Sequence, residues 1–172
     1  KFLAGEISYD RFCEMDAEAW KGMKLEALAE IVQKVPFHPG GDELIGFLKR
    51  KQLKLAMVSS GLSLLSNWVH ERYGFDYSVS NDLLDENGTL TGEVRIRVYY
   101  DKKAVWAKKI LRQFKVKPEE MIAVGDSRGD IDLFRMAGLS VAFNSSCRDI
   151  DEMASICVQS QNLADIIPKL PI

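Results

Sequence analysis

The feature that most constrains the fold is a regular alternation of strand and helix patterns from Leu53 onward. Short apolar runs typical of buried strands occur at Leu53–Val58, Met121–Val124, Ser140–Phe143 and Ile156–Val158. Helical patterns separate them, at Leu62–Arg72, Asp101–Phe114 and Ile131–Ala137. Strands joined by helices of this length form parallel βαβ units with right-handed crossovers. The sequence therefore predicts an α/β fold: a Rossmann-like parallel sheet with helices on both faces, in which Leu53–Val58 and Met121–Val124 share one sheet.

One segment departs from this alternation. An extended pattern over Tyr77–Leu84 is followed by Glu86-Asn87-Gly88, and Asn-Gly is a strong signal for a tight hairpin turn. Beyond the turn, Val94, Ile96 and Val98 alternate with charged residues, as in a strand with one exposed face. These runs predict an antiparallel hairpin inserted near residues 80–98.

The first third of the chain is helical in pattern. Apolar residues recur at helical spacing after Tyr9-Asp10, and the pattern repeats over Leu25–Val32. Pro36 and the Pro39-Gly40-Gly41 run then interrupt it. We therefore expect residues 1–35 to form part of a small helical cap, packed as a helix pair over the strand ends. Residues 36–172 should form the α/β core.

Composition restricts the class of protein. The 172 residues are 47% hydrophobic and 28% charged, a balance that supports a packed core and argues against disorder. Lys and Arg together number 23 and Asp and Glu 25, so the basic excess of a protein that grips nucleic acid is absent. No apolar run approaches the roughly 20 residues that span a bilayer. We expect neither nucleic acid nor a membrane as a partner.

The cysteines bear on the cellular compartment. Cys13, Cys147 and Cys157 are unevenly spaced and form no Cys-x-x-Cys pair, which indicates neither a disulfide framework nor a zinc site. No signal peptide is visible, so we expect a cytoplasmic protein.

Small polar residues follow two of the predicted strands. Ser59-Ser60-Gly61 comes after Leu53–Val58, and Asn144-Ser145-Ser146 comes after Ser140–Phe143. Ligands of open parallel sheets bind beyond the carboxyl ends of the strands. A strand-to-helix turn with free N–H groups and a hydroxyl suits a phosphoryl oxygen. Ser and Gly are also common turn and cap residues, and this signal alone leaves both interpretations open.

Carboxylates follow the strand Met121–Val124. Asp126 comes directly after Gly125, and Asp130 lies four residues further on, at the entry to a helix. Such a cluster of oxygen ligands suits a hard cation such as Mg²⁺. The alternative is a turn residue at Asp126 and a helix N-cap at Asp130. Neither of these roles explains an aspartate placed immediately after Val124-Gly125.

A lysine begins the helix that follows the hairpin. Lys103 lies where the helix dipole favours an acidic residue. A cation at this position is explained if it faces an anionic ligand or a carboxylate cluster. The alternative is a solvated lysine whose aliphatic stem covers apolar surface.

Ser59, Lys103, Asp126 and Asp130, in this order on consecutive strand ends, resemble the haloacid dehalogenase (HAD) superfamily of phosphohydrolases, and within it the phosphoserine phosphatases. The likeness extends from about Gly5 over nearly the whole chain. The segments that carry it are Leu55-Ala-Met-Val-Ser-Ser-Gly-Leu62, Asp101-Lys-Lys-Ala-Val105, Ile122-Ala-Val-Gly-Asp-Ser-Arg-Gly-Asp-Ile131 and Ala137-Gly-Leu-Ser-Val-Ala-Phe-Asn144. They are similar to the family's second, third and fourth motifs and to the continuation of the fourth.

The resemblance implies a role for each residue. Ser59 would bind a phosphate oxygen through its hydroxyl, with help from the N–H of Ser60. Lys103 would neutralise the phosphoryl group and the attacking carboxylate. Asp126 would be a ligand of Mg²⁺, and Asp130 would hold Lys103 and the waters of the metal in place. Positioning and charge neutralisation supply most of the catalysis in phosphoryl transfer.

The chain departs from the family pattern at the nucleophile. The family carries Asp-x-Asp-x-Thr after its first strand, where one aspartate attacks phosphorus and the second acts as general acid and base. Asp130-Ile-Asp132 and Asp149-Ile-Asp151 fit the bare spacing, but neither follows an apolar strand. We expect the first strand and its motif to lie outside the given sequence. Without that strand, Val58 and Val124 would flank a gap in the sheet.

Two further departures concern the substrate side of the site. The arginine with which the family grips a substrate carboxylate would fall near Asp16, which has the wrong charge; Arg11 is the nearest substitute. Gly129 replaces the family's usual asparagine beside the metal site. The identity of the phosphate ester is therefore less constrained than the chemistry.

The sequence thus predicts a Mg²⁺-dependent phosphatase of a small phosphorylated metabolite, phosphoserine or a similar monoester, acting through an aspartyl-phosphate. The alternative is a non-catalytic regulatory module that keeps phosphate affinity without turnover. A response-regulator receiver, whose acidic pocket also binds Mg²⁺, fits less well because receivers are shorter and lack the hairpin. The sequence does not indicate an oligomeric state.

Overall fold

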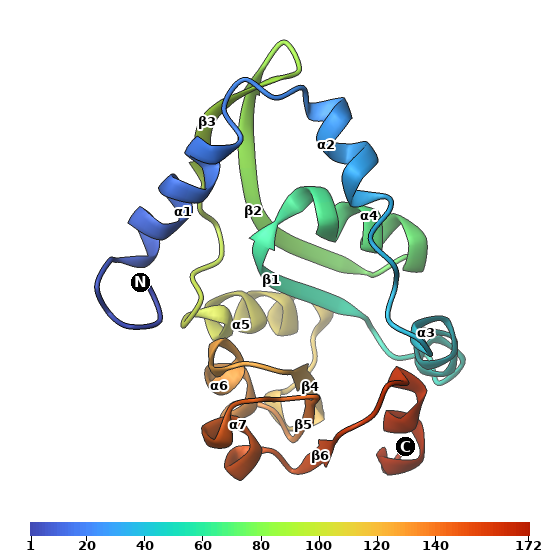
Figure 1. The fold of residues 1–172 in the computed structure, drawn as a ribbon. Coiled ribbons are helices and arrows are strands. Elements are labelled where there is room, and N and C mark those ends of the chain that lie inside the picture. Colours follow the sequence, from blue (N-terminus) through green and yellow to red (C-terminus); the bar gives the residue numbers. More distant parts are fainter. The chain divides into compact units, whose positions relative to one another are not determined.

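The computed structural model describes all residues from Lys1 to Ile172, and they form two compact units. The first contains Lys1–Pro36, Met57–Gly74 and Ser78–Tyr99. The second contains Phe37–Ala56, Phe75–Tyr77 and Tyr100–Ile172. Figure 1 shows the elements of each unit with the labels used below.

Two helices begin the first unit. Helix α1 (Tyr9–Ala19) is capped by Ser8, whose Oγ accepts a hydrogen bond from the N–H of Arg11 at 3.1 Å. Helix α2 spans Leu25–Val32. The two helices pack on different neighbours: α1 against strand β3 (Thr89–Arg95) and α2 against helix α4 (Ser63–Tyr73).

The sheet of the first unit has three strands in the order β1-β2-β3. Strand β1 spans Ala56–Leu62 and β2 spans Tyr77–Glu86. Strands β2 and β3 pair antiparallel across a turn in which Asn87 and Gly88 have φ angles of 50° and 74°. Two consecutive left-handed residues give the turn that best matches strand twist, and this is why Asn-Gly occurs there. The predicted hairpin is confirmed, but its second strand ends at Arg95, so Ile96 and Val98 lie beyond it and not in the strand as expected.

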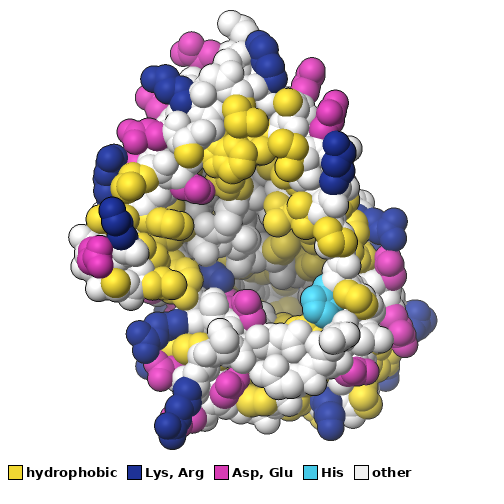
Figure 2. All heavy atoms as spheres, viewed as in Figure 1, with side chains coloured by type: hydrophobic (Ala, Val, Ile, Leu, Met, Phe, Trp, Pro, Cys, Tyr) yellow, Lys and Arg dark blue, Asp and Glu magenta, His cyan; other side chains and the backbone are white.

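Part of the surface of the first unit is apolar. Hydrophobic side chains gather on the face between α1 and α2 (Figure 2). The large hydrophobic residues most exposed in this unit are Leu3, Phe12, Met15, Ile31, Val35 and Leu65.

The second unit is built around a parallel sheet. Its strands are β4 (Ile122–Gly125), β5 (Leu139–Phe143) and β6 (Ile156–Val158), in that order. Ile122 lies opposite Leu139, and Val141 opposite Ile156. The α-helices are α3 (Gly41–Arg50), α5 (Lys103–Phe114), α6 (Ile131–Phe134) and α7 (Arg148–Met153). Short 3₁₀ turns span Pro118–Glu120, Arg128–Asp130 and Leu163–Lys169.

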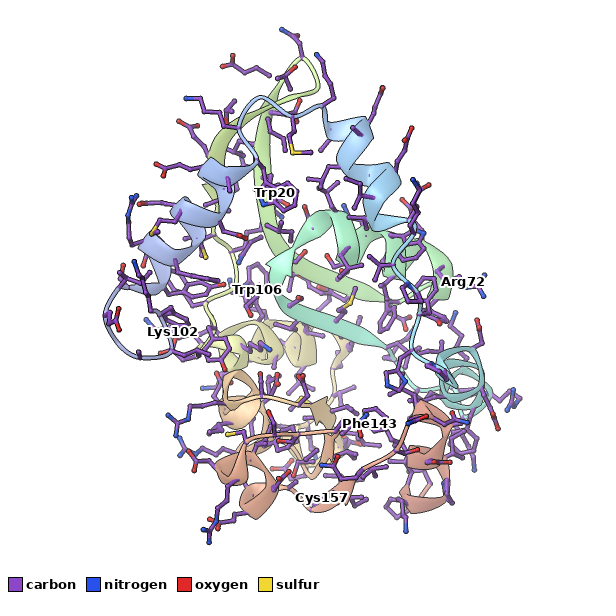
Figure 3. All side chains as sticks on the ribbon, in the orientation of Figure 1. Trp20, Arg72, Lys102, Trp106, Phe143 and Cys157 are labelled. Atoms are coloured by element: carbon purple, nitrogen blue, oxygen red, sulfur yellow. The ribbon has the colours of Figure 1, made fainter.

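Helices cover both faces of this parallel sheet. On one face, Val141 and Phe143 pack with Leu44 of α3 and with Ile166 of the last turn. On the other face, Ala142 packs with Ile150 of α7 and with Phe134 of α6. The ring of Phe143, labelled in Figure 3, contacts the ring of His38 edge-on, with 5.2 Å between the ring centroids. The predicted α/β class, a parallel sheet between two helical layers, is confirmed.

The expectation that Leu53–Val58 and Met121–Val124 share one sheet is wrong for these residues. Strand β1 belongs to the sheet β1-β2-β3, whereas β4 belongs to β4-β5-β6. A shared sheet needs a ladder of hydrogen bonds from one strand to the other, directly or through an intervening strand. No strand within residues 1–172 makes such a ladder between β1 and β4. Each of these two strands is therefore an edge of its own sheet. Val124, on the β4 edge, is 49% exposed.

The start of β1 also differs from the prediction. The strand begins at Ala56 and runs to Leu62, so Ser59-Ser60-Gly61 lies within the strand and not in a turn after it. The residue just before β1 is fixed by other hydrogen bonds: the carbonyl of Leu55 accepts from the N–H groups of Asp76 and Tyr77 at 2.8 and 3.2 Å.

The division into a cap (residues 1–35) and a core (36–172) stays a prediction. The first unit contains both predicted cap helices but also β1, α4 and the hairpin. No helix of the chain has the length and apolar character needed to cross a bilayer.

Candidate functional site

The carboxyl end of β4 turns sharply at a glycine. A Cβ atom on Gly125 would lie 2.5 Å from Cγ of Asp130, closer than such atoms approach in proteins. Glycine is therefore required here, because it lets the side chain of Asp130 fold back over the end of the strand.

Asp130 organises this strand end. Its Oδ2 accepts from the N–H groups of Asp126 and Ser127 at 3.3 and 3.2 Å, and from the Ser127 hydroxyl at 3.2 Å. Its Oδ1 lies 2.7 Å from Nζ of Lys103. The side chains of Lys103 and Asp130 are only 10% and 6% exposed. The structure thus ties the β4 turn to the start of α5 through a buried ion pair.

Lys103 occupies the first turn of α5, which contains no acidic residue. Two aspartates offset the unfavourable position of this cation at a helix N-terminus: Asp130 by the ion pair, and Asp132 by accepting from the N–H of Ala104 at 2.7 Å. The other oxygen of Asp132, Oδ1, is buried without a partner, and burial raises the pKa of this carboxyl above its ordinary value.

Sequence reasoning missed the role of Asp132. In the sequence Asp132 stands out only as half of an Asp-x-Asp spacing, whereas in the structure it caps the helix that carries Lys103. No local pattern could have found this role, because Asp132 follows Ala104 by 28 positions in the chain.

The carboxylate of Asp126, unlike that of Asp130, is free to bind a ligand. It is exposed, and its carboxylate makes no hydrogen bond or ion pair. No group of three or more His, Cys, Asp or Glu residues converges anywhere in the chain. Mg²⁺ is often held by one or two carboxylates together with waters and substrate phosphate. The free carboxylate of Asp126 could serve as the single protein ligand of such a site.

Gly129 has a steric reason to lack a side chain. A Cβ atom at this position would lie 2.8 Å from Cε2 of Tyr100 and 2.9 Å from the Tyr100 carbonyl oxygen. The ring of Tyr100 therefore occupies the space that an asparagine would need. In this structure Tyr100 therefore explains why position 129 lacks the expected asparagine.

Ser59 and Ser60 belong to the first unit, on β1. Oγ of Ser59 accepts from the N–H of Gly61 at 3.1 Å. The carbonyl of Ser60 accepts from the hydroxyl of Tyr9 and from Nδ2 of Asn81, both at 2.9 Å. Sequence reasoning missed Tyr9 and Asn81, since nothing in the local pattern connects either of them with Ser60.

The structure brings Lys103, Asp126 and Asp130 together within the second unit. Ser59 and Ser60 lie in the first unit, and their assembly with the other three into one site stays a prediction.

The two residues that bear on recognition of a substrate carboxylate, Arg11 and Asp16, lie on α1. Asp16 is exposed on that helix. Arg11 is engaged on the same helix, at 3.2 Å from Glu14 and 3.9 Å from Glu18. Arg11 is thus an exposed member of a helical ion-pair cluster in this structure.

Comparison with known proteins assigns the family. The haloacid dehalogenase-like hydrolase model matches residues 2–135. Phosphoserine phosphatase of Archaeoglobus fulgidus is 33% identical over 172 residues, which are 98% of this chain and 50% of that protein. The enzyme of Methanocaldococcus jannaschii is 28% identical over 96% of this chain and 78% of its own length. The enzyme of Albidiferax ferrireducens is 34% identical over 94% of this chain and 70% of its own length.

Solved structures agree with this assignment. A substrate-bound phosphoserine phosphatase aligns with a TM-score of 0.87 and 28% identity, over 96% of this chain and 79% of that one. A phospho-aspartyl intermediate analogue of phosphoserine phosphatase aligns with the same values. The chain belongs to the haloacid dehalogenase-like hydrolase family, and within it is similar to phosphoserine phosphatases.

Proposed function

We propose that the protein hydrolyses the phosphate monoester of a small metabolite, phosphoserine or a similar compound, in a reaction that depends on Mg²⁺. The observation that carries the proposal is the end of β4, where a buried lysine–aspartate pair lies beside a free carboxylate. A fixed cation next to an available oxygen ligand is the arrangement that binds and neutralises a phosphoryl group.

Each residue has a role in this proposal. Lys103 places its charge on the phosphoryl oxygens, and Asp130 keeps the ammonium group oriented through the 2.7 Å contact. The hydroxyl of Ser59 and the N–H of Ser60 bind phosphate oxygens. Asp126 holds Mg²⁺, which when bound would supply further positive charge to the phosphate. These contributions are electrostatic and are set in place before the reaction begins.

The proposed reaction passes through an aspartyl-phosphate. The similar solved structure of a phospho-aspartyl intermediate analogue supports this route. Residues 1–172 contain no Asp-x-Asp-x-Thr sequence, so they supply phosphate binding, charge neutralisation and a metal ligand, and the attacking carboxylate is not among them. A regulatory module that binds phosphate without turnover is the alternative outcome of the test below.

The experiment compares the 172-residue chain with the intact protein in one assay of phosphate release. Phosphoserine, other small phosphomonoesters and p-nitrophenyl phosphate serve as substrates, with Mg²⁺ and after chelation. We expect the intact protein to hydrolyse at least one of these esters and to lose the activity on chelation. The 172-residue chain should bind inorganic phosphate weakly and release none.

Two results would overturn parts of this proposal. A 172-residue chain as active as the intact protein would mean that the nucleophile lies within these residues. An intact protein that binds inorganic phosphate but releases none from any ester would favour the regulatory alternative. In the same assay, Lys103→Met removes the charge that the proposal places on the phosphoryl oxygens, and Lys103→Arg, which keeps the charge but not the geometry, is its matched control.

The proposal includes a cytoplasmic location and a small phosphate ester as the partner, with neither nucleic acid nor a membrane. The three cysteines are free, and cytosolic proteins rarely use disulfides. Cell fractionation followed by immunodetection tests the location.

A further inference from the structure

Asn81, on β2, is the most heavily hydrogen-bonded buried side chain of the first unit. The residue is 1% exposed. The two protons of its Nδ2 are shared among three acceptors: the carbonyl of Ser60 at 2.9 Å, the Tyr9 hydroxyl at 3.0 Å and the Val98 carbonyl at 3.3 Å. Its Oδ1 accepts from the N–H groups of Arg97 and Val98, both at 2.8 Å. One side chain therefore joins β1, the start of α1 and the segment that follows β3.

Tyr9 is a second donor to the carbonyl of Ser60. Its hydroxyl lies 2.9 Å from the Ser60 carbonyl and 3.2 Å from the Val98 carbonyl. Burial raises the pKa of Tyr9 far above its ordinary value, so the hydroxyl remains protonated and able to donate. The carbonyl of Ser60 is thus held by two buried donors from different elements.

The carbonyl of Ser60 and the N–H of Gly61 belong to one planar peptide group and point in opposite directions. Fixing the carbonyl therefore fixes the direction of the N–H. That N–H donates to Oγ of Ser59 at 3.1 Å. A serine hydroxyl has one proton to give, and because Oγ of Ser59 accepts from Gly61, this proton stays available for another acceptor.

We propose that Asn81 is a positioning residue for phosphate binding, acting through Ser60 and Gly61 on the hydroxyl of Ser59. The chain of contacts runs from the Asn81 amide to the Ser60 carbonyl, through the peptide plane to the Gly61 N–H, and on to Ser59 Oγ. This inference rests on the proposed function, in which the Ser59 hydroxyl donates to a phosphate oxygen.

The side-chain amide of Asn81 suits this task. The position needs a donor for the Ser60 carbonyl and an acceptor for two backbone N–H groups, and the side-chain amide supplies both. Aspartate would supply only the acceptor, and leucine neither. Asparagine is otherwise disfavoured in strands, so its presence in the middle of β2 is explained by these contacts.

The test measures affinity for inorganic phosphate by calorimetry, together with kcat and KM of the intact protein, in four forms: wild type, Asn81→Asp, Ser59→Ala and the double variant. We expect Asn81→Asp to weaken phosphate binding about tenfold and to raise KM more than it lowers kcat. In the Ser59→Ala background the same change should cost less than twofold, because the group through which Asn81 acts is gone.

Ser80→Ala is the matched structural control. Ser80 is the neighbouring buried polar residue on β2, and it bonds to Ser66. This variant should lose stability with unchanged phosphate affinity. If Asn81→Asp fails to fold, Tyr9→Phe removes one donor to the same carbonyl, with an expected two- to fivefold loss of affinity.

The outcomes separate the two proposals. A wild-type protein that neither binds phosphate nor releases it from esters overturns the proposed function, and the role of Asn81 with it. A wild-type protein that binds phosphate overturns only the inference about Asn81 if Asn81→Asp matches wild type, or if its effect is as large without the Ser59 hydroxyl as with it.

Discussion

Strands β2 and β5 are the middle strands of their sheets, but they are buried in different ways. The buried stretch of β5 is mainly apolar, with Val141, Ala142 and Phe143 packed between two helical layers. The buried stretch of β2 is Val79, Ser80 and Asn81, and its two polar residues are satisfied by named partners. The comparison teaches that apolar packing holds the buried stretch of β5, whereas matched donors and acceptors hold that of β2.

The strongest test concerns the buried ion pair between Lys103 and Asp130 in the second unit. Like the polar residues of β2, each member of this pair is buried with a specific partner. Lys103→Met leaves the Asp130 carboxylate buried without its cation, and breaking such a pair costs about 3–5 kcal/mol of unfolding free energy. Urea unfolding measures the loss. The exposed Lys108→Met is the control and should stay within about 0.5 kcal/mol of wild type. Equal stability of both variants would show that the pair is not buried.

The second test changes volume beside β5. Ile150 is fully buried against Ala142, and Ile150→Ala should lower the unfolding free energy by about 2–4 kcal/mol because it leaves a cavity. Ile150→Val should lower it by only about 1 kcal/mol. Denaturant midpoints at constant slope give both values. If the two variants were equally stable, the packing of this face would be loose and the contrast with β2 would fail.

The third test removes a hydroxyl from β2. Ser80→Ala changes volume little but takes away the partner of the Ser66 hydroxyl, at an expected cost of about 1 kcal/mol. Ser66 retains a contact with the Ser63 carbonyl at 3.3 Å, which limits the loss. Thermal unfolding of Ser80→Ala beside Ser80→Thr, which keeps the hydroxyl, separates hydrogen bonding from packing. A stabilised Ser80→Ala would contradict the reading of β2.

The smallest effect tests a charged contact at the entry to β1. Asp76 accepts from Lys54 Nζ at 2.7 Å and from the Leu55 N–H at 2.9 Å, and the contact with Lys54 holds the pKa of Asp76 below its ordinary value of 3.8. A depressed pKa adds stability above the unfolded value, and this stability is lost as the pH falls through the folded value. Asp76→Asn should therefore cost up to about 1 kcal/mol at pH 7 and nothing once the pH is well below 3.8. A difference that persists in acid would point to packing.

Features encoded by neighbouring residues were predictable from the sequence. The hairpin follows from Asn87-Gly88, because few residue pairs accept two positive φ angles. The end of β4 follows from an apolar strand, a glycine and two spaced aspartates. In each case a few consecutive residues carry both the conformation and the chemistry.

Features that depend on distant residues were not predictable in this way. Asn81 and Tyr9 are 72 positions apart, and no periodicity reports that they share the Ser60 carbonyl. The separate sheets were missed for a related reason. An apolar run identifies a strand, but which strand it pairs with depends on partners elsewhere in the chain.

The edges of β1 and β4 have a consequence for handling this chain in solution. Each strand has one side without a hydrogen-bonded neighbour among residues 1–172. Unpaired N–H and C=O groups along an extended strand accept another strand from any molecule that reaches them, which is the usual route to edge-to-edge association. The exposed Val124 adds apolar surface at one such edge. Self-association of these residues should therefore rise with protein concentration, and light scattering across a dilution series would register it.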